Sequence, residues 1–220
     1  MIKSKSLLSI ISFITFLLLI STSSLVFASY GPEHILKGHF RGKGGASGQP
    51  GILGQVSYWN DPSVSEYNFN YTNSINNATD IWSRLSGQFS FTRHSSLQSS
   101  TMIQVFVVNN VLPNGVSGAT RYFDSQQNRF LTPNEVTNGS VFDVAAIYLD
   151  HGRMNGGLFS RSHTLEERYH NTAHEFGHAL SMHHFENSPA HSGNHIMKSG
   201  RISLTTLTNT DKDHFWRKWY

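Results

Sequence analysis

The sequence contains no cysteine among its 220 residues. A chain without cysteine forms no disulfides, so its stability must come from packing or from bound metal. The same absence excludes a cysteine nucleophile and any zinc site with thiolate ligands. Metal chemistry in this chain would therefore have to use histidine or carboxylate side chains.

Charged residues are also few, at 14% of the chain, and neither sign dominates. There are 17 basic and 14 acidic residues, and without Lys3 and Lys5 in the amino-terminal segment 15 basic residues remain. This near-balance gives no reason to expect nucleic acid or an anionic membrane as a partner. We expect a monomer.

The first 28 residues have the pattern of an export signal. Lys3 and Lys5 are followed by an almost unbroken apolar run at residues 7–20, and residues 26–28, Val-Phe-Ala, suit signal peptidase. An uncleaved anchor is the alternative, but the run is shorter than the ~20 apolar residues that a spanning helix needs. We therefore expect cleavage after Ala28 and a secreted, extracellular protein without stable membrane association.

The remaining 192 residues are enough for one ordinary domain. Eight of the 24 residues at 31–54 are glycine, and such a segment loses much backbone entropy on ordering. We expect residues 29–54 to be a flexible leader or a short pro-segment. The folded domain is then predicted to span residues 55–220.

Hydrophobic patterning predicts an α+β domain with a sheet packed on two helices. Strands are predicted at residues 55–59, around 89–91, at 102–108 as a central strand, and at 144–149, with a short edge strand or loop at 115–123 and a polar loop at 124–139. A last helix is predicted from about residue 211 to 219.

The two main helices have clearer start and stop signals. The first is indicated by the spacing of Ile75, Ala78, Trp82 and Leu85, with Thr72 or Asn73 as its cap and Gly87 at its end. The second begins near Thr164, because Thr164 and Glu167 have the spacing of a capping box. Its predicted core stripe consists of Leu165, Tyr169, Phe176 and Leu180.

The second helix carries a possible metal motif. Ten of the 13 histidines lie between residues 151 and 214, and His174, Glu175 and His178 fit His-Glu-x-x-His. Residues four apart on a helix can face one metal ion, and Glu175 could take a proton from a water bound to it. Zinc needs a third protein ligand, for which His184 is predicted. The alternative is that these are ordinary surface or core histidines.

The segment from His174 to His184 resembles the extended zinc motif of the metzincin peptidases, in particular their matrixin-like branch. Residues 58–59, 82–85, 145–149 and 207–211 fall in matrixin-like order, so the resemblance covers roughly residues 55–220, although only the zinc segment is specific. Residues 194–197 resemble the Met-turn, in which Met197 would form an apolar floor beneath the metal. The resemblance implies a twisted mixed sheet on two long helices, a zinc cleft and a carboxy-terminal helix.

The sequence departs from that family in two places. Ser181 stands where the family has glycine, at a turn that needs a left-handed backbone, and serine costs roughly 1 kcal/mol or more there. A shifted turn would make His183 the substitute ligand, and a peptidase that recruits a distant acid would use Asp211 or Asp213. The thiol that blocks zinc in matrixin pro-segments is also missing.

The resemblance implies peptide-bond hydrolysis with one catalytic Zn²⁺ held by His174, His178 and His184, and Glu175 as general base. No tyrosine follows Met197 to assist the oxyanion. A protein or peptide substrate would pair with an edge strand, which we place at residues 118–123.

Structural Ca²⁺ or a second zinc is common in matrixins, but no spacing in this sequence supports such a site. The available side chains are therefore predicted to be solvated loop residues: Asp124, Asp143, Asp150, His151 and His163.

A secreted metal-binding or adhesive protein without catalysis is the competing interpretation. Glu175 discriminates between the two, because a binding protein has no need of a carboxylate between its ligands. The sequence therefore favours a zinc-dependent endopeptidase.

Overall fold

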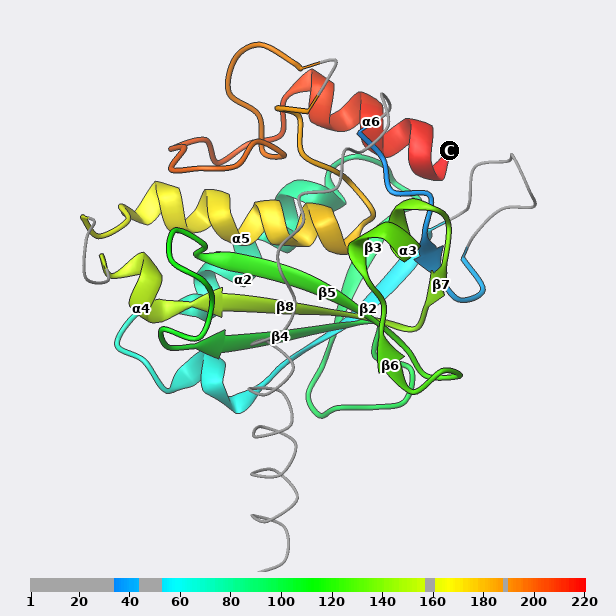
Figure 1. Ribbon diagram of the computed structural model, residues 1–220, viewed down its shortest axis with the longest axis horizontal. Coiled ribbons are helices and arrows are strands. Elements are labelled where there is room, and N and C mark those ends of the chain that lie inside the picture. Colours follow the sequence, from blue (N-terminus) through cyan, green and yellow to red (C-terminus); the bar gives the residue numbers. More distant parts are fainter. Residues whose placement is uncertain (1–33, 44–52, 157–160, 188–189) are drawn as a thin grey trace, which may run out of the picture.

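The computed structural model describes residues 34–43, 53–156, 161–187 and 190–220, so the predicted signal at residues 1–28 lies outside the described residues. The described chain has an α+β fold in which helices cover one face of a mixed sheet (Figure 1). No helix in this part of the protein has the length and apolar character needed to cross a membrane.

The main sheet contains parallel and antiparallel strands. Its members are β2 (Gln55–Asn60), β3 (Ser90–His94), β4 (Ile103–Val108), β5 (Gly118–Asp124), β6 (Arg129–Phe130) and β8 (Val144–Asp150), in the order β3-β2-β4-β8-β5-β6. The first three and β8 are parallel, whereas β5 is antiparallel to both β8 and β6. The predicted strands are confirmed, and β4 is central as expected.

Two long helices cover one face of this sheet. These are α2 (Tyr71–Ser83) and α5 (Leu165–Ala179). The other helices of the described chain are η1 (Pro62–Ser65), α3 (Pro133–Thr137), α4 (His151–Met154) and α6 (Asn209–Trp219). As predicted, α2 and α5 pack on each other and on the sheet, and α6 lies on the outer side of α5 (Figure 1). Phe215 of α6 contacts the ring of Trp82 with 6.0 Å between centroids.

Helix α2 is held next to the histidine motif by Trp82, whose Nε1 donates to the carbonyl of Ala173 at 2.9 Å. The buried positions Ile75, Ala78 and Trp82 confirm the predicted stripe. The predicted cap is wrong, because Asn70 accepts the N–H of Asn73 and starts the helix two residues earlier.

The predicted end of α2 is also wrong, since the helix stops at Ser83 with Arg84 as its C-cap rather than at Gly87.

The predicted polar loop at residues 124–139 contains the short strand β6 and helix α3. Thr132 and Glu135 form a reciprocal capping box, and Val136 is fully buried. A single turn of helix shows no apolar periodicity, so its capping residues were the only local signal.

The prediction of a flexible leader is wrong for residues 34–43. Strand β1 (His39–Phe40) pairs in parallel with β7 (Val141–Phe142), and Leu36 and Phe40 are 5% and 1% exposed. These two apolar side chains enter the core, and that burial offsets the entropy lost on ordering the segment.

Asp150 supports the end of β8 from a fully buried position. Its carboxylate accepts four backbone N–H groups at 2.8–3.0 Å, from Asn110, Val111, Leu112 and Arg153. We expect Asp150→Ala to lower the free energy of unfolding by at least about 3 kcal/mol, because it leaves these donors unpaired. Denaturant titration measures the change.

Asp80→Ala is the matched control, because the Asp80–Arg84 pair is exposed and should be worth less than about 1 kcal/mol. Equal losses in the two variants would contradict the assignment of Asp150 as a buried cap.

Candidate metal centre

Helix α5 carries three of the four predicted site residues: His174, Glu175 and His178. Its start is confirmed, because Thr164 accepts the backbone N–H of Glu167 while the Glu167 carboxylate accepts the N–H of Thr164 at 2.8 Å. This capping box sets the register of the helix ten residues before the first histidine of the motif.

The predicted core stripe of α5 is correct only in its second half. Phe176 and Leu180 are fully buried, whereas Leu165 is 49% exposed and Tyr169 is half-buried. Polar groups occupy the buried face near the start instead, and Arg168 donates to the carbonyl of Met154. Apolar spacing alone could not show that paired polar groups fill this face.

The helix ends in a turn that places the third histidine. Ser181 has a φ of 65°, and the N–H groups of Ser181 and Met182 donate to the carbonyls of His178 and Gly177 at 2.8 and 2.9 Å. This is the Schellman arrangement, which glycine usually completes. Serine therefore adopts the left-handed conformation here, and its hydroxyl donates to the carbonyl of Gly38 at 2.9 Å.

The turn brings three histidine side chains to one point. The Nε2 atom of His178 lies 3.0 Å from that of His174 and 2.9 Å from that of His184, and the third separation is 3.2 Å. Nitrogen ligands about 2.05 Å from a tetrahedral zinc ion would lie about 3.3 Å apart. Among the described residues, this is the one group of histidines and acids arranged to hold a metal ion.

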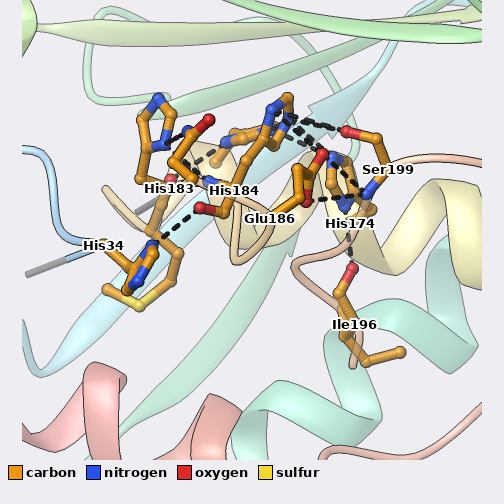
Figure 2. A network of polar contacts seen from close by, with 10 residues as sticks. His34, His174, His183, His184, Glu186, Ile196 and Ser199 are labelled. Carbon is orange, nitrogen blue, oxygen red and sulfur yellow. Dashed lines mark hydrogen bonds and ion pairs between the residues drawn. The ribbon is translucent and has the colours of Figure 1, made fainter. Parts of the chain in front are cut away.

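In two of the three rings the other nitrogen points away from this group and bonds to a backbone carbonyl. Nδ1 of His174 donates to the carbonyl of Ile196 at 2.7 Å (Figure 2). Nδ1 of His178 donates to the carbonyl of Met182 at 2.9 Å. Because a carbonyl can only accept, the proton lies on Nδ1 and the lone pair on Nε2. Lone pairs directed at one another would repel without a cation, so the donor set fits a metal.

Burial keeps these imidazoles neutral. It lowers the pKa of His174 well below its usual value, that of His178 to about 4 and that of His184 to about 2. Metal ligands must be deprotonated, and these histidines are therefore ready to bind at neutral pH.

Glu175 lies between the first two ligands in sequence but is held by strand β5. Glu175 is 4% exposed, and the hydroxyl of Thr120 donates to its Oε2 at 2.8 Å. A Cβ at Gly118 would lie 2.6 Å from Oε1, so glycine leaves the space that this oxygen occupies. In the metal-free protein, burial raises the pKa of Glu175 to about 8.

Met197 is fully buried against α5, where a Cβ on Gly177 would collide with its sulfur atom. The fully buried carboxylate of Asp211 accepts the N–H groups of Ile196 and Met197, each at 3.2 Å. Asp211 therefore supports the turn at Ile196 and Met197 and is not part of the ligand group. Asp213 is exposed and also lies outside that group.

His183 is not part of the ligand group either. Its Nδ1 accepts the backbone N–H of His184 at 2.7 Å, and its ring centroid is 6.3 Å from that of His178. The ring of His184 lies at 4.7 Å from the same ring, so the turn selects His184 as predicted.

The carboxylates considered for calcium are not solvated loop residues, and that prediction is wrong. Asp124 and Asp143 both pair with Arg41, at 2.8 and 2.7 Å. The guanidinium group of Arg41 therefore lies between the two carboxylates. Asp150 is the buried cap described above.

The two histidines of that set are also engaged. His151 Nδ1 contacts the hydroxyl of Tyr71 at 2.9 Å, and its ring stacks on Tyr67. Burial lowers the pKa of His163 to about 4, and its Nε2 lies 3.3 Å from the hydroxyl of Ser117.

Sequence reasoning missed three residues around the centre. Thr120 contacts Glu175, Glu186 lies 3.7 Å from Nδ1 of His184, and His34 contacts the backbone of His184. Thr120 and His34 are distant in sequence from the residues they contact, so no local pattern could have indicated them.

Fold and site together define an α+β domain with a partly buried tri-histidine group able to hold a metal ion. No family model matches this chain. A search of curated proteins also finds no match. The proposed activity therefore rests on the geometry of the site alone.

Proposed function

We propose that this protein is a secreted, zinc-dependent endopeptidase of the metzincin type, similar to its matrixin-like branch. One observation carries the proposal: three histidines have Nε2 atoms that converge within 3.2 Å, and a buried carboxylate, Glu175, lies in the sequence between two of them. A metal-storage or adhesive protein needs the histidines but has no use for this carboxylate.

Each residue has a distinct role in this proposal. His174, His178 and His184 hold the zinc ion, which when bound lowers the pKa of a water molecule and polarises the scissile carbonyl. Glu175 accepts a proton from the attacking water and passes it to the leaving amine. Thr120 keeps one carboxylate oxygen in place, because its hydroxyl donates to Oε2.

The substrate would lie extended along β5. Strand β6 pairs with β5 only at Phe123 and Asp124, so in the described chain no strand covers the outer edge at residues 118–120. An extended peptide could add there as a further strand. Thr120, which donates to Glu175, and Gly118, which leaves space for its carboxylate, lie on this same stretch.

The export signal predicted at residues 1–28 supports an extracellular site of action. We expect the secreted protein to begin at Ser29 and to act on protein or peptide substrates as a monomer.

Digestion of a broad peptide library by purified residues 29–220 tests the activity. We expect cleavage that stops when a chelator removes the metal and returns when zinc is added. Zinc binding without any cleavage would favour the metal-binding alternative. Cleavage that persists in chelator would contradict the proposed mechanism.

A further inference from the structure

The segment at residues 34–38, far from the motif in sequence, runs alongside the turn that carries the third ligand. The N–H of Leu36 donates to the carbonyl of Ser181 at 2.8 Å, and the N–H of His183 donates to that of His34 at 2.9 Å. Between these bonds Ile35 forms an antiparallel bridge with Met182. The turn is therefore paired along its length with this segment.

Side chains strengthen the pairing at both ends. Nδ1 of His34 donates to the carbonyl of His184 at 2.8 Å, which is the backbone of the ligand itself (Figure 2). At the other end the hydroxyl of Ser181 donates to the carbonyl of Gly38. This bond offsets part of the free-energy cost of a left-handed backbone at serine.

His184 depends on such support more than the other two ligands do. His174 and His178 belong to a helix, and their rings donate to carbonyls at 2.7 and 2.9 Å. Apart from the other two ligand histidines, the ring of His184 has only longer polar contacts, 3.7 Å to Glu186 and 3.4 Å to Ser199. Its position is therefore determined mainly by its backbone.

The supporting segment is itself fixed to the rest of the domain. The ammonium group of Lys218 on α6 donates to the carbonyls of Leu36, Lys37 and Gly38 at 2.7, 3.0 and 2.9 Å. Further along, Arg41 pairs with Asp124 and Asp143. These anchors do not involve the metal group.

From these contacts we infer that residues 34–38 are a positioning segment for the third metal ligand, and that His34 is the residue through which they hold His184. The inference concerns metal binding and does not depend on the proposed peptidase activity. It requires that zinc affinity change when His34 can no longer donate to His184.

A pair of variants at His34 tests this requirement in the purified chain. His34→Phe keeps an aromatic ring but has no donor, and we expect it to bind zinc about 10–100-fold more weakly, as is typical for lost outer-shell partners. His34→Asn keeps an amide donor near the position of Nδ1 and should stay within about threefold of the original affinity. Competition with a chromophoric chelator measures each dissociation constant.

Denaturant unfolding of the metal-free variants provides the second readout. Unchanged zinc affinity in His34→Phe, with or without a loss of stability, would show that the segment only packs and would overturn the inference. Should His34→Phe not fold, Lys218→Met and Lys218→Arg make the same comparison at the anchor. Weaker zinc binding in Lys218→Met but not in Lys218→Arg supports the inference, and equal zinc binding in the two variants overturns it.

Discussion

Glu175→Gln is expected to lower the rate of peptide-bond cleavage by about 10²–10⁴-fold, the usual loss when a general base is removed. The amide has the shape of the carboxylate but cannot accept a proton from water at neutral pH. Zinc content should stay near one per chain, because Glu175 is outside the group of three converging nitrogens. Casein digestion and elemental analysis of the same preparation measure both quantities.

Glu166→Gln is the matched control for this experiment. Glu166 is an exposed residue in the first turn of the same helix, so it undergoes the same chemical change away from the site. We expect its cleavage rate to equal that of the unaltered protein. Equal rates in Glu175→Gln would instead point to a different base or a contaminating protease.

His184→Ala is expected to lose most of the bound metal, whereas His183→Ala should keep it. The Nε2 of His184 lies within 3.2 Å of both other ligand nitrogens, and His183 faces the backbone instead. If three ligands share a binding free energy of about 10–16 kcal/mol, losing one weakens binding by at least about 10²-fold. Zinc per chain after dialysis against a weak chelator measures the difference.

The pair also tests the conformation of the turn at Ser181. If His183→Ala released the metal and His184→Ala retained it, the left-handed turn described here would be wrong. Ser181→Gly should keep the metal, because glycine adopts the same backbone conformation without strain.

Local patterns were sufficient where a few neighbouring residues control the outcome. The capping box at Thr164 and Glu167 predicted the start of α5, and helical spacing predicted that His174 and His178 share a face. The strand at residues 102–108 was predicted from its apolar character on both faces, and β4 does lie inside the sheet. These features depend on backbone geometry and solvation within one element.

Predictions failed where the answer depended on a distant partner. Leu165 fits the apolar stripe of α5 but is exposed, because paired polar groups fill the buried face near the start of the helix. Asp150 looks like a loop carboxylate, yet backbone donors from a separate segment bury it. The glycine content around residue 40 masked Phe40, which enters the core.

The sequence by itself determined the motif, the helix that presents it and the type of ligand that a chain without cysteine can offer. Only the tertiary structure decided between His183 and His184, removed Asp211 from the possible ligands and brought Thr120 to Glu175 and His34 to the third ligand. The physical reason is the distance along the chain over which each interaction acts. Capping and helical spacing act over three or four residues, whereas these decisions depend on side chains that approach only after the sheet, the helices and the amino-terminal segment have packed.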